Sequence, residues 1–472
     1  MANPSAAVKV EFSENDLNTL KRLERLPFGK PQMHLLFMGG LGYTFDGMDA
    51  GIVAFIMAPV MALWGLTNAQ TGIVGSSLMI GYLVGAFSAG TLGDLIGRRA
   101  VMMYALGVYT IATLVAALSP SWEFLFWSRV VAGAGIGAES AIIAPFLSEF
   151  VQSKYRGRFI GSLAGFFSFG FVFAALLGYF VVPSHSDGWR IVQIIAFVPI
   201  VMLLWWRRSL PESPRFLMMH GRSHEAEQVV ARMEESFKRA GKTLAPYEDV
   251  QIPALGVRKA GTFFQNLAAL WGHGMVRTTV MLWILWISIT FSYYGFFTWI
   301  PTLLVKEGMT VTKSFGYSII IYLAQIPGYY SGAFVSEKLD RKWTIVLYLL
   351  LGGVSAYFLS GARSDGLITF FGFCLSFFMN GTYAGIYAYT PELYPTTFRT
   401  TGMGVASSFG RIGGLAAPLI IGFTYAQIGF VGVFTITTIV LVIGALGVAI
   451  LGMSTAGKSL EQIAVEETGG SK

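Results

Sequence analysis

The sequence predicts an all-α membrane protein whose twelve transmembrane helices form two pseudo-symmetric halves of six. Three observations lead to this prediction: an apolar composition, twelve long apolar stretches and a charged motif that occurs twice. Of the 472 residues, 54% are hydrophobic and only 12% are charged. A chain this apolar is not an ordinary soluble multidomain protein. The lipid bilayer is therefore its expected environment.

Each predicted span is long enough to cross a bilayer as a helix, which takes roughly 17 to 25 residues. The stretches of the first half are residues 33–61, 71–92, 100–119, 122–147, 159–183 and 189–206. Those of the second half are residues 278–303, 314–336, 343–362, 366–390, 403–426 and 429–452. The expected domains are a cytoplasmic lead (1–32), an amino-terminal half (33–206), a cytoplasmic linker with short helices (207–277), a carboxyl-terminal half (278–452) and a cytoplasmic tail (453–472).

The repeated motif relates the two halves by one constant shift of 243 positions. Residues 90–99, GTLGDLIGRR, align with residues 333–342, AFVSEKLDRK. Two further pairs follow the same shift: Glu149 with Glu392, and Arg156 with Arg399. A parallel internal repeat in a hydrophobic chain is typical of secondary transporters, whose halves rock against each other around a central site.

Basic residues give the expected orientation. Of the 33 lysines and arginines, 27 fall in the lead, in alternate loops on the same side and in the tail, and four fall in the opposite loops. By the positive-inside rule, both termini face the cytoplasm. The net charge of +7 is then an orientation signal. Because the basic residues are scattered over membrane-flanking loops, no nucleic-acid partner is expected.

The sequence predicts no cofactor, no metal site and no enzyme activity. Its one cysteine, Cys374, lies in an apolar span, so a disulfide framework or thiolate metal site is excluded. Residues 452–459 satisfy the phosphate-loop pattern, but they follow the last span instead of a buried strand. Energy is therefore expected from an ion gradient or from the substrate gradient, and not from ATP.

Five charged residues lie well inside the predicted spans: Asp46, Asp49, Arg129, Glu139 and Arg411. Each is costly in hydrocarbon unless it faces a partner or a cavity. With a rise of about 1.5 Å per residue, both aspartates lie roughly 17 to 21 Å from the inner face, and Arg129 lies about 20 Å from it. We therefore expect Asp46 or Asp49 to form an ion pair with Arg129.

This ion pair suits proton coupling. Protonation of a partly desolvated aspartate removes its attraction to an arginine, which stays charged. The alternative is a static pair that only fixes helix packing. Glu139 is expected about 5 Å from the inner face, either as a proton exit or as a member of a cytoplasmic ion pair.

Arg411 stands alone on the eleventh span, which has no acidic residue. A buried cation of this kind fits a carboxylate substrate, which a guanidinium binds bidentately. The alternatives are that Arg411 bonds backbone carbonyls or pairs with an aspartate of the first half. The expected remainder of the substrate lining is Tyr293, Tyr294, Gln325, Asn380, Tyr383 and Tyr387, whose rings have membrane-interface or packing roles as the alternative.

These motifs resemble the major facilitator superfamily, which implies its twelve-helix fold. Residues 90–99 resemble the loop between its second and third spans, and residues 129–137 resemble its fourth-span motif. Further segments resemble the sugar-porter branch and its metabolite:proton relatives, namely residues 148–157, 211–215, 391–399 and 457–461.

Within that branch, the substrate signal comes from narrower resemblances. Asp46-Gly-Met-Asp49 resembles the first-span signature of aromatic acid:proton symporters. Residues 291–301, 323–328 and 409–414 look most like bacterial niacin transporters. Aromatic residues stand on the seventh span where sugar porters carry a paired glutamine and an asparagine. The resemblance therefore implies uptake of a small aromatic or heterocyclic carboxylate, with nicotinate first.

The resemblance also implies a cytoplasmic gate that locks the outward-open state. Two positions depart from the family pattern: Leu95 replaces a basic residue, and Asp340 stands where the second-half turn normally has glycine. The expected gate residues are Asp94, Arg98, Arg99, Glu149, Arg156, Glu212, Arg215, Glu337, Arg341, Lys342, Glu392 and Arg399.

The resulting hypothesis is a proton symporter of the cytoplasmic (inner) membrane that works by alternating access and functions as a monomer. Its expected partners are the carboxylate, protons and the lipid bilayer. One rival is a symporter for a sugar, a polyol or another organic acid; a sugar would need polar groups that bind hydroxyls. The other rival is a nontransporting membrane sensor, which ordinarily carries a large soluble signalling domain.

Overall fold

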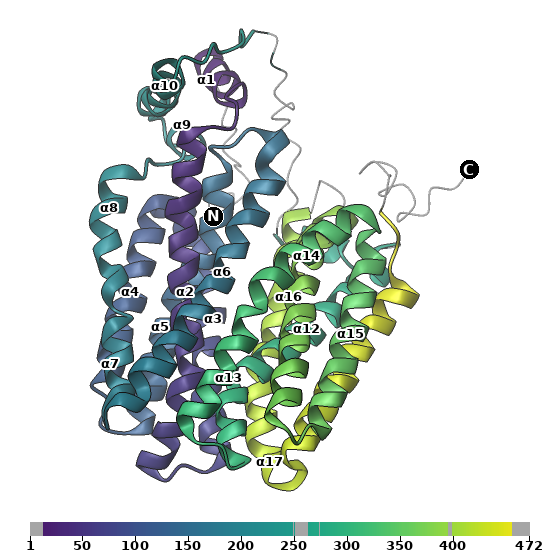
Figure 1. Cartoon of the computed structure of the whole chain (residues 1–472). Coiled ribbons are helices and arrows are strands. Elements are labelled where there is room, and N and C mark those ends of the chain that lie inside the picture. Colours follow the sequence, from purple (N-terminus) through teal and green to yellow (C-terminus); the bar gives the residue numbers. More distant parts are fainter. Residues whose placement is uncertain (1–12, 249, 251–262, 273, 395–398, 456–472) are drawn as a thin grey trace, which may run out of the picture.

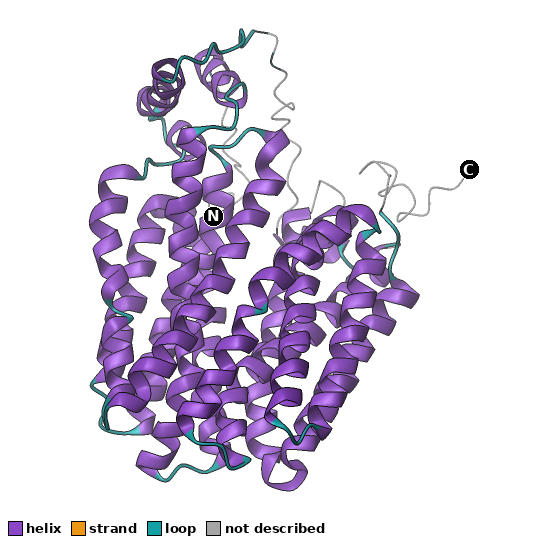
Figure 2. Ribbon diagram, viewed as in Figure 1, coloured by secondary structure: helices purple, strands orange, loops and turns teal. Residues whose placement is uncertain are grey.

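Two helical bundles stand side by side in the structure (Figure 1). The computed structural model describes residues 13–248, 250, 263–272, 274–394 and 399–455. Within these ranges every regular element is a helix, as Figure 2 shows. The prediction of an all-α fold is confirmed.

The first half contains five long helices and one interrupted span. α2 has Pro31 in its first turn, and α3 begins at a capping box formed by Thr67 and Gln70. The sixth span is interrupted before Pro199, which has no N–H to bond the carbonyl of Ile195. The elements are α2 (Lys30–Trp64), α3 (Asn68–Ile96), α4 (Arg98–Ala117), α5 (Trp122–Ser148), α6 (Ser153–Val181), η1 (Val182–Ser184), α7 (Gly188–Ile195), η2 (Val198–Val201) and α8 (Met202–Ser209).

The second half contains the six elements α12 (Met275–Lys306), α13 (Val311–Leu323), α14 (Gln325–Lys338), α15 (Arg341–Gly361), α16 (Asp365–Leu393) and α17 (Arg399–Leu451). The eighth span, expected to be continuous, is divided at Ala324 because Pro327 cannot donate to the carbonyl of Leu323. α17 contains the last two spans, which turn at Gly429, where φ is 58° and ψ is −166°.

The predicted number of spans agrees with these helices. Ten helices of the described ranges are long and apolar enough to cross a membrane. That number counts α17 once although it turns at Gly429, and it omits α13 and α14, which are each too short alone. Counting α17 twice and joining α13 to α14 gives the two sets of six.

The sequence repeat is reproduced in the packing of the two halves. A Cβ atom on Gly85 of α3 would lie 1.8 Å from the carbonyl oxygen of Ala134, and one on Gly328 of α14 would lie 2.3 Å from that of Phe377. The shift of 243 takes Gly85 to Gly328 and Ala134 to Phe377. Neither site has room for a side chain, so glycine lets the helices approach closely.

Short helices gather outside the first half, at what we call the linker end of the molecule (Figure 1). They include α9 (Pro214–Met219) and α10 (Ser223–Arg239) from the expected linker and α1 (Glu14–Glu24) from the lead; α11 (Phe263–Ala269) also belongs to the linker. α1 was not predicted. It is held to α10 by Arg22 and Arg25, whose guanidiniums lie 2.8 and 2.7 Å from the carboxylate of Glu234.

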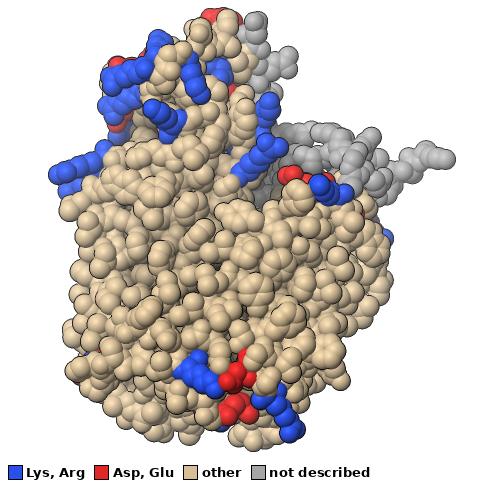
Figure 3. Space-filling view, viewed as in Figure 1, with Lys and Arg blue, Asp and Glu red and all other residues tan. Residues whose placement is uncertain are grey.

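On the face shown in Figure 3, charged side chains lie toward the two ends and leave the surface of the middle apolar. Burial alone would raise the pKa of Glu234, but hydrogen bonds from Arg22 and Arg25 hold that pKa below its ordinary value. The charged side chains at the linker end form a cap on the first half. The apolar middle matches the hydrocarbon of a bilayer.

Candidate functional site

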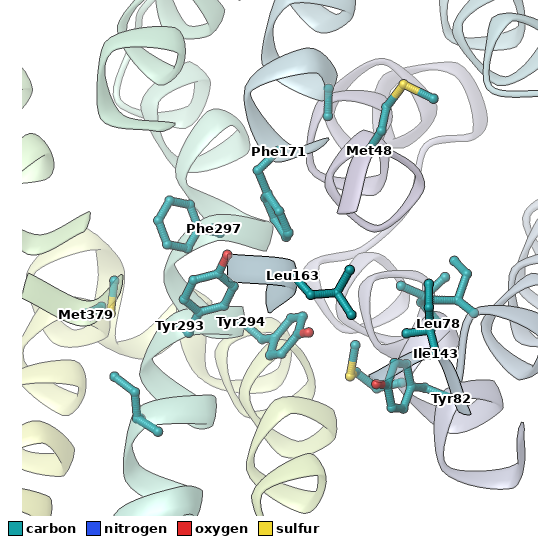
Figure 4. Packing of buried hydrophobic residues seen from close by; sticks show 14 of the residues in the cluster. Met48, Leu78, Tyr82, Ile143, Leu163, Phe171, Tyr293, Tyr294, Phe297 and Met379 are labelled. Carbon is teal, nitrogen blue, oxygen red and sulfur yellow. The ribbon is translucent and has the colours of Figure 1, made fainter. Parts of the chain in front are cut away.

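The two halves meet through aromatic side chains halfway along the bundles. The ring of Phe171 on α6 lies 5.7 Å from that of Tyr293 and 5.9 Å from that of Phe297, both on α12. Figure 4 shows Tyr293 and Tyr294 projecting from α12 toward the first-half residues Phe171 and Leu163. The buried charges lie near this interface, in two separate groups.

The first group contains the expected ion pair, and its acidic member is Asp49. Arg129 of α5 donates from Nη1 to Asp49 Oδ1 at 3.0 Å and from Nη2 to the Asp49 backbone oxygen at 2.8 Å. Thr113 of α4 donates to the same Oδ1 at 2.8 Å. Both charged side chains are fully buried. The pair therefore fastens α2 to α5 and α4, and pairing of Asp46 with Arg129 is not what the structure shows.

Asp46 faces a different part of α5. Its Oδ2 accepts from the hydroxyl of Ser140 at 3.2 Å, and within the described chain its Oδ1 has no hydrogen-bond partner. Glu139, next to Ser140, is also fully buried, and neither of its carboxylate oxygens has a partner in the described residues. Of the two alternatives for Glu139, membership of a cytoplasmic ion pair is thus not observed among the described residues.

Asp46 and Glu139 are close neighbours. The Oε1 atom of Glu139 lies 2.6 Å from the position that a Cβ of Gly42 would take, and Gly42 is one helical turn before Asp46. The two carboxyl groups also interact electrostatically. We call Asp46 and Glu139 the acid pair. A carboxylate that is buried without a cation is costly, so this arrangement favours at least one bound proton.

Tyr43 connects the acid pair to the second charged group. Its hydroxyl donates to the backbone oxygen of Ser140 at 3.2 Å, while the Ser140 side chain holds Asp46. The Tyr43 phenol lies within electrostatic range of both Asp46 and Arg411. One tyrosine thus lies between the buried acids and the lone arginine.

The second group is Arg411 of α17, which is surrounded by tyrosines. Its Nη2 donates to the hydroxyl of Tyr82 at 2.9 Å, and its Nη1 donates to that of Tyr294 at 3.4 Å. The guanidinium also lies over the Tyr82 ring, 4.1 Å from its centroid. Tyr383 and Tyr387 complete the electrostatic surroundings. We call these four residues the tyrosine cage. Among the described residues Arg411 forms no ion pair with an aspartate or glutamate, so a pair with a first-half aspartate is not observed.

The other expected lining residues lie beside this cage on the second half. The rings of Tyr383 and Tyr387 are stacked, with centroids 6.3 Å apart, and both residues are half-buried. Tyr293 donates to Gln325 Oε1 at 3.0 Å, and the Gln325 amide nitrogen has no partner among the described residues. Asn380 instead donates to the backbone of its own helix, at Ser376.

Four residues that contact these charges were not predicted from the sequence: Tyr43, Tyr82, Thr113 and Ser140. Their only signal was a hydroxyl within an apolar span, which many other serines, threonines and tyrosines share. Tyr82 is also near two close-packing glycines, Gly81 and Gly85, a position that directs α3 toward α5.

Comparison with known proteins identifies the family. The profile described as "Sugar (and other) transporter" matches residues 11–466. The chain belongs to this transporter family. It is thus a multi-pass membrane transporter of the major facilitator type and not an enzyme.

Similar proteins include two named for niacin. The "Niacin transporter NiaP" of Acinetobacter baylyi is 39% identical over 448 residues, which cover 95% of this transporter and 100% of that protein. The "Putative niacin/nicotinamide transporter NiaP" of Bacillus subtilis is 36% identical and covers 91% of this chain and 98% of its own. The inward-open xylose transporter XylE of E. coli has a similar fold, with a TM-score of 0.73 at 17% identity over 92% of this chain and 99% of its own.

At the linker end of the transporter, the expected gate residues form one ion pair in each half. Arg98 pairs with Glu149, and Arg341 lies 2.8 Å from Glu392. The two pairs are related by the shift of 243. Glu149 also accepts a hydrogen bond from Ser213, which leads into α9. The repeat therefore places the same contact between neighbouring spans of both halves.

The turns before these arginines also match. Gly97 has a φ of 97° and a ψ of 148°, and Asp340 has 119° and 143°. This left-handed backbone favours glycine, as the family pattern indicated for the second half. Asp340 keeps the conformation and accepts a hydrogen bond from Ser454 at 2.7 Å.

Other expected gate residues have different partners. Arg156 lies 3.3 Å from Glu24 of α1 and also donates to the backbone of Val151. Glu212 accepts from the backbone N–H of Arg99 at 3.3 Å. Arg215 is half-buried near Glu24, Glu337 is exposed, and Lys342 lies over the Trp343 ring. The side chains of Asp94 and Arg399 lie outside the described residues.

Proposed function

We propose that this transporter imports a small aromatic or heterocyclic carboxylate, nicotinate first, by proton symport with alternating access. The observation that supports the substrate class most is Arg411 within the tyrosine cage. Among the described residues its hydrogen-bond partners are neutral phenols, and a carboxylate would supply the missing negative charge. The aromatic rings beside it would stack on a planar ring. Similarity to two proteins named for niacin supports nicotinate as the first choice.

The acid pair is the site of the exchanged proton in this proposal. Asp49 is held by hydrogen bonds from Arg129 and Thr113. Asp46 and Glu139 have no such cation in the described structure and would carry the proton. The Asp49–Arg129 pair responds to that proton through its shared helices α2 and α5. The proposal thus gives a role to each of Asp46, Asp49, Arg129 and Glu139. Asp49 is a less direct site for the exchanged proton than Asp46 or Glu139.

The proposed cycle places the linker end in the cytoplasm of the cell, at its inner membrane, with both termini on that side. The gate pairs Arg98–Glu149 and Arg341–Glu392 lie at this end, one in each half. Their positions suit a lock that forms in the outward-open state and loosens when the halves rock. The transporter functions as a monomer because both charged groups of the site come from one chain.

Uptake by proteoliposomes under an imposed pH gradient tests the proposal. Nicotinate, benzoate and xylose are compared side by side, each with an acidic exterior and with equal pH on both sides. We expect nicotinate to accumulate only when the exterior is acidic. Accumulation of xylose with neither acid transported would refute the carboxylate proposal. Equal nicotinate accumulation without the pH gradient would refute proton coupling.

A further inference from the structure

Arg411 contacts both halves of the transporter, and its shorter hydrogen bond crosses between them. The Tyr82 hydroxyl belongs to α3 of the first half and lies 2.9 Å from Arg411 Nη2. The second-half contact to Tyr294 is longer, at 3.4 Å. Tyr82 is buried and its ring lies beneath the guanidinium at 4.1 Å. The position of the arginine is therefore set from the opposite half.

The hydrogen bond leaves the Tyr82 hydroxyl with an unused proton. A phenol can accept one hydrogen bond and donate another. Here the oxygen accepts from Arg411, and the hydroxyl hydrogen has no acceptor among the described residues. Arg411 itself is only partly buried.

These two donors suit one carboxylate. Its oxygens can accept from a guanidinium N–H and from the adjacent phenol O–H, and both bonds are strengthened by the negative charge. A neutral carboxamide offers a single, weaker carbonyl acceptor in the same position. The phenol therefore adds to the preference for an acid over an amide of the same ring.

We propose that Tyr82 is a substrate-binding residue that donates its hydroxyl proton to the carboxylate held by Arg411. This inference rests on the proposed function and deepens it, because it gives the anion site one donor from each half. The bound carboxylate then joins α3 to α17. Substrate binding itself favours closure of the two halves around the site.

Closure of the two halves would build on a contact that α3 and α17 already make. A Cβ on Gly72 of α3 would lie 2.6 Å from the carbonyl oxygen of Pro418 on α17, and one on Gly422 would lie 2.7 Å from that of Asn68. The helices are thus tightly packed beyond the site, away from the linker end. A ligand that adds a further link between α3 and α17 stabilises this packing.

Kinetics of Tyr82→Phe test the inference. The variant keeps the ring beneath Arg411 and removes only the hydroxyl. We expect the KM for nicotinate to rise on the order of tenfold, because a hydrogen bond to a charged group is lost, with little change in the maximal rate. Inhibition by nicotinamide should weaken by much less. The matched control is Tyr104→Phe, which removes the hydroxyl of an exposed tyrosine on α4 of the same half and should leave both ligands unaffected.

A second measurement separates binding from folding. The rise in Tm on adding nicotinate to the purified, full-length protein reports binding without transport. This rise should be smaller in Tyr82→Phe than in the wild type. Tyr82→His, which retains an N–H donor, should recover part of the lost rise. An unchanged KM in Tyr82→Phe, or an equal loss for nicotinate and nicotinamide, would overturn the inference while leaving nicotinate transport established. A wild-type protein that neither binds nor transports nicotinate would overturn the proposed function and the inference together.

Discussion

The two halves share their contacts at the ends of the helices and differ in the middle. At the linker end, Arg98–Glu149 and Arg341–Glu392 are equivalent pairs, and the turns at Gly97 and Asp340 have the same conformation. Halfway along the bundles this equivalence is lost. The contacts that the halves share therefore suit a common motion, whereas the site depends on the positions at which the repeat is broken.

The buried charges illustrate the difference. Shifted by 243, Asp49 corresponds to Ser292 and Arg129 to Gly372, so the second half has no equivalent ion pair. In the other direction Arg411 corresponds to Ser168. The proton chemistry of the proposal therefore belongs to the first half, and the arginine of the anion site belongs to the second.

The largest expected effect is on stability, at the ion pair that only the first half has. Asp49→Asn leaves Arg129 buried without a counter-charge, which we expect to cost about 3 to 5 kcal/mol. Thermal unfolding of the detergent-solubilised protein measures it. The control, Asp365→Asn, breaks an exposed pair with Lys313 and should cost about 1 kcal/mol or less. Equal losses in the two variants would show that the buried pair has no special role.

The next effect tests whether the second half holds the substrate anion. Arg411→Ala should weaken nicotinate binding at least about 30-fold, since a charged partner of the carboxylate is removed. Binding is measured by the nicotinate-induced rise in Tm and by uptake. Arg363→Ala, at an exposed site between α15 and α16, is the matched control. Normal nicotinate affinity in Arg411→Ala would place the anion site elsewhere.

A third test concerns coupling through the acid pair. One proton per nicotinate allows about tenfold accumulation for each pH unit, because 1.4 kcal/mol corresponds to a factor of ten. Glu139→Gln keeps the shape but cannot release a proton, so accumulation should vanish while nicotinate exchange at equal pH persists. Glu123→Gln, at the exposed start of the same helix α5, should accumulate nicotinate normally. Unimpaired accumulation in Glu139→Gln would remove this residue from the coupling mechanism.

The smallest effect concerns the turns at Gly97 and Asp340, where the two halves have the same backbone conformation. Gly97→Ala should destabilise the protein by about 1 to 3 kcal/mol, because its backbone is left-handed. A Cβ there would also lie 2.5 Å from Glu212 Oε2. Asp340→Gly should change the stability by less than about 1 kcal/mol, since relief of the backbone opposes loss of the Ser454 hydrogen bond. Similar Tm losses in the two variants would mean that the turns are not equivalent in energy.

Much of the fold was predictable because its signals are local. Apolar length gave the spans, and the constant shift gave the two halves. Two features were missed for different reasons. The division at Ala324 depends on Pro327, which cannot donate to one carbonyl, and α1 depends on partners on α10 that cover its apolar face. Neither could be decided from hydropathy alone.

For the site, the sequence was enough to predict which charges lie within the spans and at what depth. Helical rise placed Asp46, Asp49 and Arg129 at similar depths, but it does not give the rotation of one helix against another. That Asp49 faces Arg129 while Asp46 faces Ser140 and Glu139 follows from the packing of the helices in three dimensions. It also brought Tyr82 to Arg411 across 329 positions of sequence. A contact between two halves depends on how the bundles dock, and no local pattern within either helix records that.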